Sequence, residues 1–163
     1  MLKFHSYNIV FQEVPGEVTL AFNLTNCPNG CKGCHSPYLQ EDIGETLDKS
    51  VIADLLAKYG NAVTCVGFMG GDADPLTVEK LSCYIRELTH SQIKTAWYSG
   101  RQNLPKHLSI ENFNYIKLGP YIESLGGLDS PATNQRFYRI DHGAMIDETF
   151  LFRKKSNLTP KVG

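Results

Sequence analysis

The sequence lacks the features that would associate it with a membrane or with nucleic acid. No apolar run reaches the roughly 18 to 20 residues that a membrane-spanning helix requires, and residues 1–6 lack the apolar core and cleavage site of a signal peptide. The formal net charge is −1, from 16 basic and 17 acidic side chains. No excess of positive charge therefore favours nucleic acid or an anionic membrane. We expect a cytoplasmic protein with neither partner.

Internal repeats, low-complexity segments and long linkers are also missing from the sequence. The 163 residues fit one domain with a sizeable core, and an apolar fraction of 42% is ordinary for a globular protein. We expect residues 1–163 to form a single domain. The basic run Arg153-Lys154-Lys155 is expected to be a solvated stretch of charge.

Short β-branched and apolar segments alternate with helical patterns along the chain. Strands are expected at residues 18–24, 62–69, 93–98, 115–118, 136–140 and 150–152. Helices are expected at 51–59, where Gly60 is a C-terminal stop, and at 75–88, where Asp74 is the N-terminal cap. This alternation predicts parallel βαβ units, and the chain is too short for an eight-fold barrel of about 250 residues. The expected fold is an α/β fold, an open partial (β/α) barrel with a mainly parallel sheet.

The five cysteines are unevenly distributed. Three lie within eight residues, in the loop after the first expected strand: Cys27, Cys31 and Cys34. Clustered cysteines in a reducing compartment are more often metal ligands or catalysts than disulfides. Cys65 and Cys83 lie singly in apolar surroundings, and we expect them to be small core residues.

The spacing Cys27-x3-Cys31-x2-Cys34 supplies three thiolates from one short loop. Iron–sulfur clusters usually take four thiolate ligands, so three would leave one iron available to a small molecule. A structural zinc site with His35 as fourth ligand is an alternative, although zinc sites usually pair two such units and no second pair exists here. A redox-active thiol site is a third interpretation that the spacing leaves open.

The order of the motifs resembles the radical S-adenosylmethionine (SAM) superfamily, because Gly70-Gly71-Asp72 follows the strand after the cysteine motif. More narrowly, the chain resembles the activating proteins of anaerobic (class III) ribonucleoside-triphosphate reductase. The resemblance covers about residues 8–140 and rests on the motifs at 27–35, 70–72, 97–100, 119–125 and 133–136. The sequence departs from the family at 131–133, where Pro-Ala-Thr replaces the frequent Gly-Ser-Ser.

The resemblance implies that these motifs bind two cofactors. A [4Fe–4S] cluster would be ligated by Cys27, Cys31 and Cys34. The adenine of SAM would lie beside Gly33, Cys34 and His35. The methionine part of SAM would be held by Gly70, Gly71 and Asp72, with a contact from Ser99. The glycines would allow a close approach of the backbone. The resemblance leaves open whether Asn134 and Gln135 contact SAM or a protein partner.

The implied activity is the generation of a glycyl radical on another enzyme. An electron from the reduced cluster would cleave SAM, and the 5′-deoxyadenosyl radical would take a hydrogen atom from a glycine of the partner. The implied partners are the anaerobic ribonucleoside-triphosphate reductase and a low-potential electron donor such as flavodoxin or ferredoxin. Two other functions remain open, a radical SAM enzyme that acts on a free small molecule and a zinc-binding interaction module.

Overall fold

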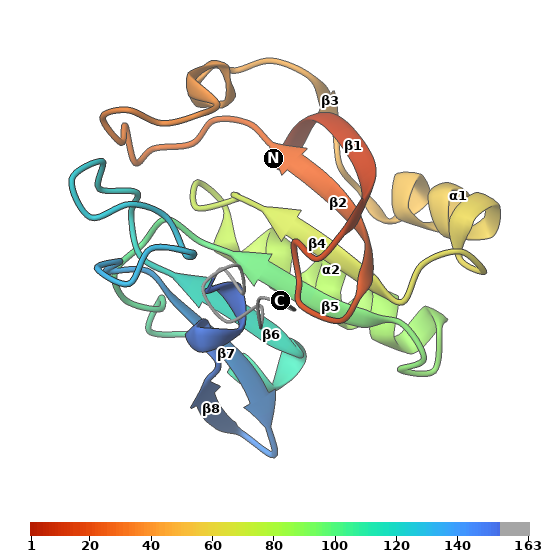
Figure 1. Cartoon of the computed structure of the whole chain (residues 1–163). Helices are drawn as coiled ribbons and strands as arrows, with labels where there is room; N and C mark the ends of the chain where they lie inside the picture. Colours follow the sequence, from red (N-terminus) through yellow and green to blue (C-terminus); the bar gives the residue numbers. More distant parts are fainter. Residues whose placement is uncertain (154–163) are drawn as a thin grey trace, which may run out of the picture.

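The computed structural model describes residues 1–153, which form an α/β fold on one eight-stranded sheet (Figure 1). The strands are β1 (Lys3–Phe11), β2 (Val18–Leu24), β3 (Glu45–Thr46), β4 (Cys65–Met69), β5 (Lys94–Tyr98), β6 (Tyr115–Leu118), β7 (Arg136–Asp141) and β8 (Ala144–Asp147). Their order across the sheet is β3-β1-β2-β4-β5-β6-β7-β8. The α-helices are α1 (Lys49–Tyr59) and α2 (Pro75–Leu88), and 3-10 helices cover Pro37–Gln40, Ile110–Asn112 and Thr149–Phe152. Lys154 and Lys155 of the expected charge run lie outside the described residues.

The centre of the sheet is parallel and its flanks are antiparallel. Strands β2, β4, β5 and β6 pair in parallel, whereas β1 and β3 on one side and β7 and β8 on the other pair antiparallel. Four of the seven pairings in the described range are therefore antiparallel, and the expectation of a mainly parallel sheet is wrong. For two of these pairings, β1–β2 and β7–β8, the physical reason is that short turns join consecutive strands, a connection that only antiparallel strands permit. The sheet is open, with β3 and β8 at its edges.

The expected central strands and both helices are confirmed, with small differences in their bounds. Both helices begin at an aspartate cap: Asp48 Oδ1 accepts a hydrogen bond from the Val51 amide at 3.0 Å, and Asp74 Oδ1 accepts one from the Thr77 amide at 3.2 Å. These caps satisfy amides that the first helical turn leaves unpaired. The expected strand at 150–152 is wrong, because Thr149–Phe152 is a 3-10 helix.

Both helices cover the same face of the sheet (Figure 1). Their apolar side chains share one core with alternate strand residues, and this core includes Ile52 and Leu56 of α1 and Val78, Leu81 and Ile85 of α2. A smaller cluster on the sheet contains Val14, Cys65, Ala96, Tyr115 and Phe137, with Phe152 packed against it. No helix within residues 1–153 is long and apolar enough to cross a membrane.

Candidate functional site

Four loops follow the parallel strands and meet at one edge of the sheet, which we call the carboxyl edge (Figure 1). The first is the cysteine loop, residues 25–36, and the others begin at Gly70, Ser99 and Gly119. Such edges are where ligands bind in parallel α/β folds. The predicted site residues therefore lie on loops that the parallel centre of the sheet brings together.

Asp72 connects two of these loops, and its side chain is nearly inaccessible, at 1% exposed. Its carboxylate accepts hydrogen bonds from Ser99 Oγ at 2.5 Å, the Gly100 amide at 2.8 Å and Asn29 Nδ2 at 2.6 Å. Arg101 donates to the Asp72 carbonyl oxygen at 2.8 Å. Burial of a carboxylate is costly unless donors replace its water. The carboxylate thus fastens the cysteine loop to the end of β5.

At the two glycines before Asp72, the missing side chain does not leave open space for a ligand beside the Cα atom. Both have positive φ, +107° at Gly70 and +91° at Gly71, a conformation that favours glycine. A Cβ atom at Gly71 would lie 2.6 Å from Val78 Cγ2 and 3.0 Å from Leu24 Cδ1, inside the core. The missing side chain of Gly71 therefore meets a packing requirement against α2 and β2, and its expected role toward SAM stays a prediction.

Lys117 is a buried cation at the carboxyl edge that the motif analysis missed. It is 9% exposed, and its Nζ donates to the carbonyl oxygens of Ser99 at 3.1 Å and Gly119 at 2.8 Å. Burial lowers the pKa of Lys117 to about 8, although the charges of Asp72, Cys31 and Cys27 favour its protonated form. Lys117 ties the ends of β5 and β6 together and places an ammonium group near the loop thiols. The signal in the sequence was a lysine inside an otherwise apolar strand.

The three cysteines of the loop are free and partly exposed. No group of three or more His, Cys, Asp or Glu side chains in the described part of the chain is arranged to hold a metal ion. The donor set nevertheless fits an iron–sulfur cluster by its chemistry, because soft thiolates are the ligands that such clusters take. The cysteine loop contains neither helix nor strand over residues 25–35, and Asn29 already attaches it to the carboxyl edge.

The two isolated cysteines have different surroundings. Cys65 in β4 is fully buried, and burial raises the pKa of its thiol to about 12. Cys83 in α2 is partly exposed, and burial also raises its pKa. The expectation of a core residue is confirmed for Cys65 and only partly for Cys83.

The loop after β6 lies against the distal half of the cysteine loop. The rings of His35 and Tyr121 are 5.2 Å apart between centroids, and a Cβ at Gly33 would lie 3.0 Å from Glu123 Oε2. A cavity of about 490 Å³ is lined here by Lys32, Tyr121, Ile122, Glu123 and Ser124. His35 and Gly33, two of the residues expected beside adenine, thus adjoin the loop that lines this cavity, although neither of them lines it.

Asn134 and Gln135 also lie at the carboxyl edge, but the hydrogen-bond partners of their side-chain amides differ. Gln135 is buried and its Nε2 donates to the Gly119 carbonyl oxygen at 3.4 Å. Asn134 Nδ2 donates to the Pro120 carbonyl oxygen at 3.0 Å, whereas its buried Oδ1 has no partner among the described residues. Buried acceptors are usually satisfied, so Asn134 is the better candidate of the two for a contact with a bound molecule.

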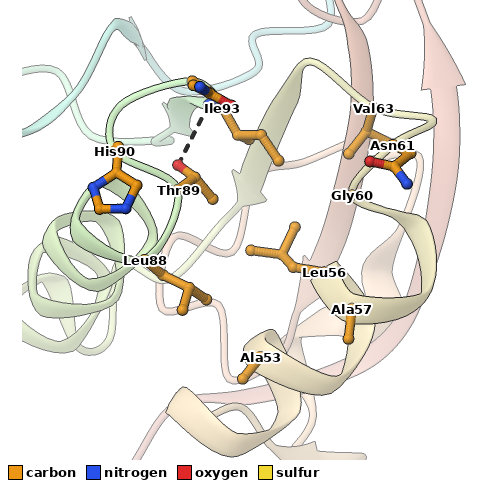
Figure 2. Close-up of a pocket in the computed structure, with 11 residues that line it drawn as sticks. Ala53, Leu56, Ala57, Gly60, Asn61, Val63, Leu88, Thr89, His90 and Ile93 are labelled. Carbon is orange, nitrogen blue, oxygen red and sulfur yellow. Dashed lines mark hydrogen bonds between the residues drawn. The ribbon is translucent and has the colours of Figure 1, made fainter.

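A larger cavity lies away from this chemistry. It has a volume of about 630 Å³ and is lined by the ends of α1 and α2 and by residues that precede β4 and β5, including Leu56, Val63, Leu88, His90 and Ile93 (Figure 2). The Ile93 amide donates to Thr89 Oγ1 at 3.4 Å in its wall. This cavity is at the opposite edge of the sheet from the cysteine loop, and apolar and small side chains dominate it.

Comparison with protein-family models, curated proteins and solved structures finds no match to this chain.

Proposed function

We propose that this chain is an activating enzyme of the radical SAM type, which generates a glycyl radical on an anaerobic ribonucleoside-triphosphate reductase. The observation that carries the proposal is the 2.6 Å hydrogen bond from Asn29 to Asp72. It joins the three-cysteine loop to the Gly-Gly-Asp turn at the edge where parallel sheets bind ligands. The two sequence motifs that define the resemblance therefore meet in space, although 43 residues separate Asn29 from Asp72 in the sequence.

The cysteine loop would hold the cluster through Cys27, Cys31 and Cys34, and SAM would bind between that loop and the turn at 70–72. When bound, a [4Fe–4S] cluster supplies one electron, which breaks a C–S bond of SAM and leaves methionine and a 5′-deoxyadenosyl radical. A donor such as flavodoxin or ferredoxin would replace that electron. The sheet would then correspond to an open partial barrel of the radical SAM type, with antiparallel flanks added to its parallel centre.

The chain's own side chains prepare the site in two ways. Asp72 holds the cysteine loop and the end of β5 in one arrangement, and Lys117 holds the ends of β5 and β6. These contacts connect the four loops of the carboxyl edge, and such positioning is the usual contribution of a protein to cofactor chemistry.

The open rim favours a protein substrate over a free small molecule. Ile122 at the rim is 39% exposed, and it lines the cavity of about 490 Å³. Small-molecule sites usually enclose most of their ligand and exclude water. An open depression beside the cysteine loop is better suited to a loop that a partner protein presents and covers.

The test is the appearance of a protein radical on the partner. The protein is loaded with iron and sulfide without oxygen, then mixed with the reductase, a reductant and SAM. We expect an electron paramagnetic resonance doublet near the free-electron g value, which is lost when the target glycine of the reductase is replaced by alanine. Activator with Cys31→Ala serves as the control and should produce no signal.

Two other results would point to the alternative functions. If the reductase acquires no radical while a small metabolite is consumed with SAM, the chain is a radical enzyme with a free substrate. A colourless protein that contains stoichiometric zinc and cleaves no SAM would indicate the zinc-binding interaction module instead.

A further inference from the structure

Asn29 lies between the first two cysteines of the loop and contacts one of them. Its Nδ2 atom is 3.5 Å from Cys27 Sγ and 2.6 Å from Asp72 Oδ2. One amide nitrogen, which carries two hydrogens, therefore bridges a buried carboxylate and a thiol that would become a metal ligand.

The position of this amide is tightly constrained from the other side of the site. The Asp72 carboxylate that accepts from Asn29 is itself held by two further donors, Ser99 Oγ and the Gly100 amide. The end of β5 also closes over the amide, since a Cβ at Gly100 would lie 2.5 Å from Asn29 Nδ2. The side-chain nitrogen of Asn29, which faces Cys27 Sγ, is thus held in place by Asp72 and by the end of β5.

A donor aimed at a ligand sulfur has a known electronic consequence. Hydrogen bonds to the sulfurs are among the factors that set the reduction potential of an iron–sulfur centre. They stabilise the reduced state more than the oxidised state, because the reduced centre carries more negative charge on its sulfurs. Partners of this kind act through the ligand and do not touch the substrate.

We propose that Asn29, oriented by Asp72, is a positioning residue that donates a hydrogen bond to the Cys27 thiolate and thereby raises the reduction potential of the centre held by the cysteine loop. The inference rests on the proposed function, since it requires an iron–sulfur centre at these cysteines. It assigns to Asp72 a role toward the cysteine loop in addition to any contact with SAM.

The test is a redox titration of Asn29→Ala against wild-type protein. Both are loaded with iron and sulfide and titrated anaerobically with dithionite, without SAM and without reductase, while electron paramagnetic resonance records the reduced centre. We expect near-wild-type iron and sulfide in the variant, because all three thiols remain. At a fixed potential, the ratio of reduced to oxidised centre should fall by about tenfold, which for a one-electron couple is about 59 mV.

Asn26 provides a matched control in the same loop. Its Nδ2 donates to Asp42 Oδ1 at 3.1 Å in a solvent-exposed hydrogen bond, and Asn26 itself is half-buried next to Cys27. Asn26 has φ of +60°. Asn26→Gly therefore removes the side-chain amide and keeps a backbone conformation that glycine adopts easily. This variant should titrate like wild type.

The outcomes separate this inference from the proposed function. Suppose that wild type holds a cluster and cleaves SAM. The inference is overturned, and the proposed function stands, if Asn29→Ala titrates like wild type. The same holds if Asn26→Gly shifts the ratio of reduced to oxidised centre as much as Asn29→Ala does. If wild type binds only zinc, both are overturned. Should Asn29→Ala load too little iron to titrate, Asn29→Ser decides, because its shorter side chain cannot bridge Asp72 and Cys27: an unchanged ratio overturns the inference and a fall supports it.

Discussion

Opposite charges are buried close together at the carboxyl edge, in the side chains of Asp72 and Lys117. They are 1% and 9% exposed, and both are bonded to Ser99, Asp72 through the hydroxyl and Lys117 through the carbonyl oxygen. Hydrogen-bond partners compensate the burial of each charge, and a buried charge that lost those partners would be costly. Their shared partner Ser99 connects the turn that contains Asp72 with strand β6.

Gly71 provides a prediction at the scale of one residue. Gly71→Ala should lower the free energy of unfolding by about 2–4 kcal/mol, because it adds overpacking to the strain of a positive φ. The overpacking follows from a Cβ only 2.6 Å from Val78 Cγ2. The measurement is urea unfolding of the metal-free protein followed by circular dichroism.

Gly16 is the matched control for that substitution. Its φ of +79° resembles that of Gly71, but a Cβ there would meet nothing within 4 Å. Gly16→Ala should therefore lose only about 1–2 kcal/mol, from backbone strain alone. Equal losses in the two variants would show that the Gly71 Cα does not face the core.

At the scale of elements, the cysteine loop and strand β4 place their cysteines in opposite environments. We predict that Cys27→Ala, Cys31→Ala and Cys34→Ala each abolish cluster binding and cleavage of SAM, because two thiolates from one loop are too few anchors. Iron and sulfide analysis of anaerobically loaded protein measures binding, and 5′-deoxyadenosine formation measures cleavage.

The remaining cysteines are the controls. Cys65→Ala and Cys83→Ala should retain cluster and cleavage and cost only about 1 kcal/mol in packing. Cys65 lies wholly within the sheet, and its raised pKa keeps it a neutral thiol. Loss of iron from Cys65→Ala with retention in Cys27→Ala would overturn the ligand assignment.

The flanking strands illustrate which elements the sequence patterns miss. Strand β8 follows β7 through a turn at His142 and Gly143, whose φ values are +50° and +79°. Two-residue hairpin turns of this kind need positive φ at both central residues, which favours glycine at the second position. Gly143 meets that requirement, but His142 is not among the residues that usually precede it, so the hairpin signal in the sequence is weak. At 150–152 the apolar run suggested a strand, but Thr149 bonds to Asp147 Oδ1 and the chain turns into a 3-10 helix instead.

At the scale of the whole molecule, two edges of the sheet differ in what they expose. Ile122 is exposed at the carboxyl edge, beside the cysteine loop. We predict that Ile122→Asp lowers glycyl-radical formation on the reductase by tenfold or more in initial rate, because a charge at an apolar interface position must be desolvated on docking. The same variant should form 5′-deoxyadenosine at the wild-type rate when the reductase is absent.

Leu88 is the control at the opposite edge. It is 45% exposed and lines the cavity shown in Figure 2. Leu88→Asp should leave both rates unchanged. A larger effect from Leu88→Asp than from Ile122→Asp would place the partner at the other edge of the molecule.

The sequence alone predicted the local features of this protein. The central strands, both helices and the cap at Asp74 follow from apolar periodicity and capping residues, which depend on neighbours in the chain. The cysteine loop was also evident, because its spacing and its glycine, proline and asparagine content are local properties. The placement of Cys27, Asp72 and Ser99 after strand ends followed from the same patterns, although their roles toward cofactors stay predictions.

The tertiary structure decided how these local features face one another. The contact between Asp72 and Asn29 depends on the distance between two loops that are far apart in sequence. The direction in which the Gly71 Cα faces, toward a ligand or toward the core, depends on tertiary packing in the same way. The antiparallel direction of β7 against β6 depended on tertiary pairing, since the long connection from Leu118 to Arg136 permits either direction. Lys117 became part of the site for the same reason: only the packing of β5 against β6 brings its ammonium group to two carbonyl oxygens and near the cysteine loop.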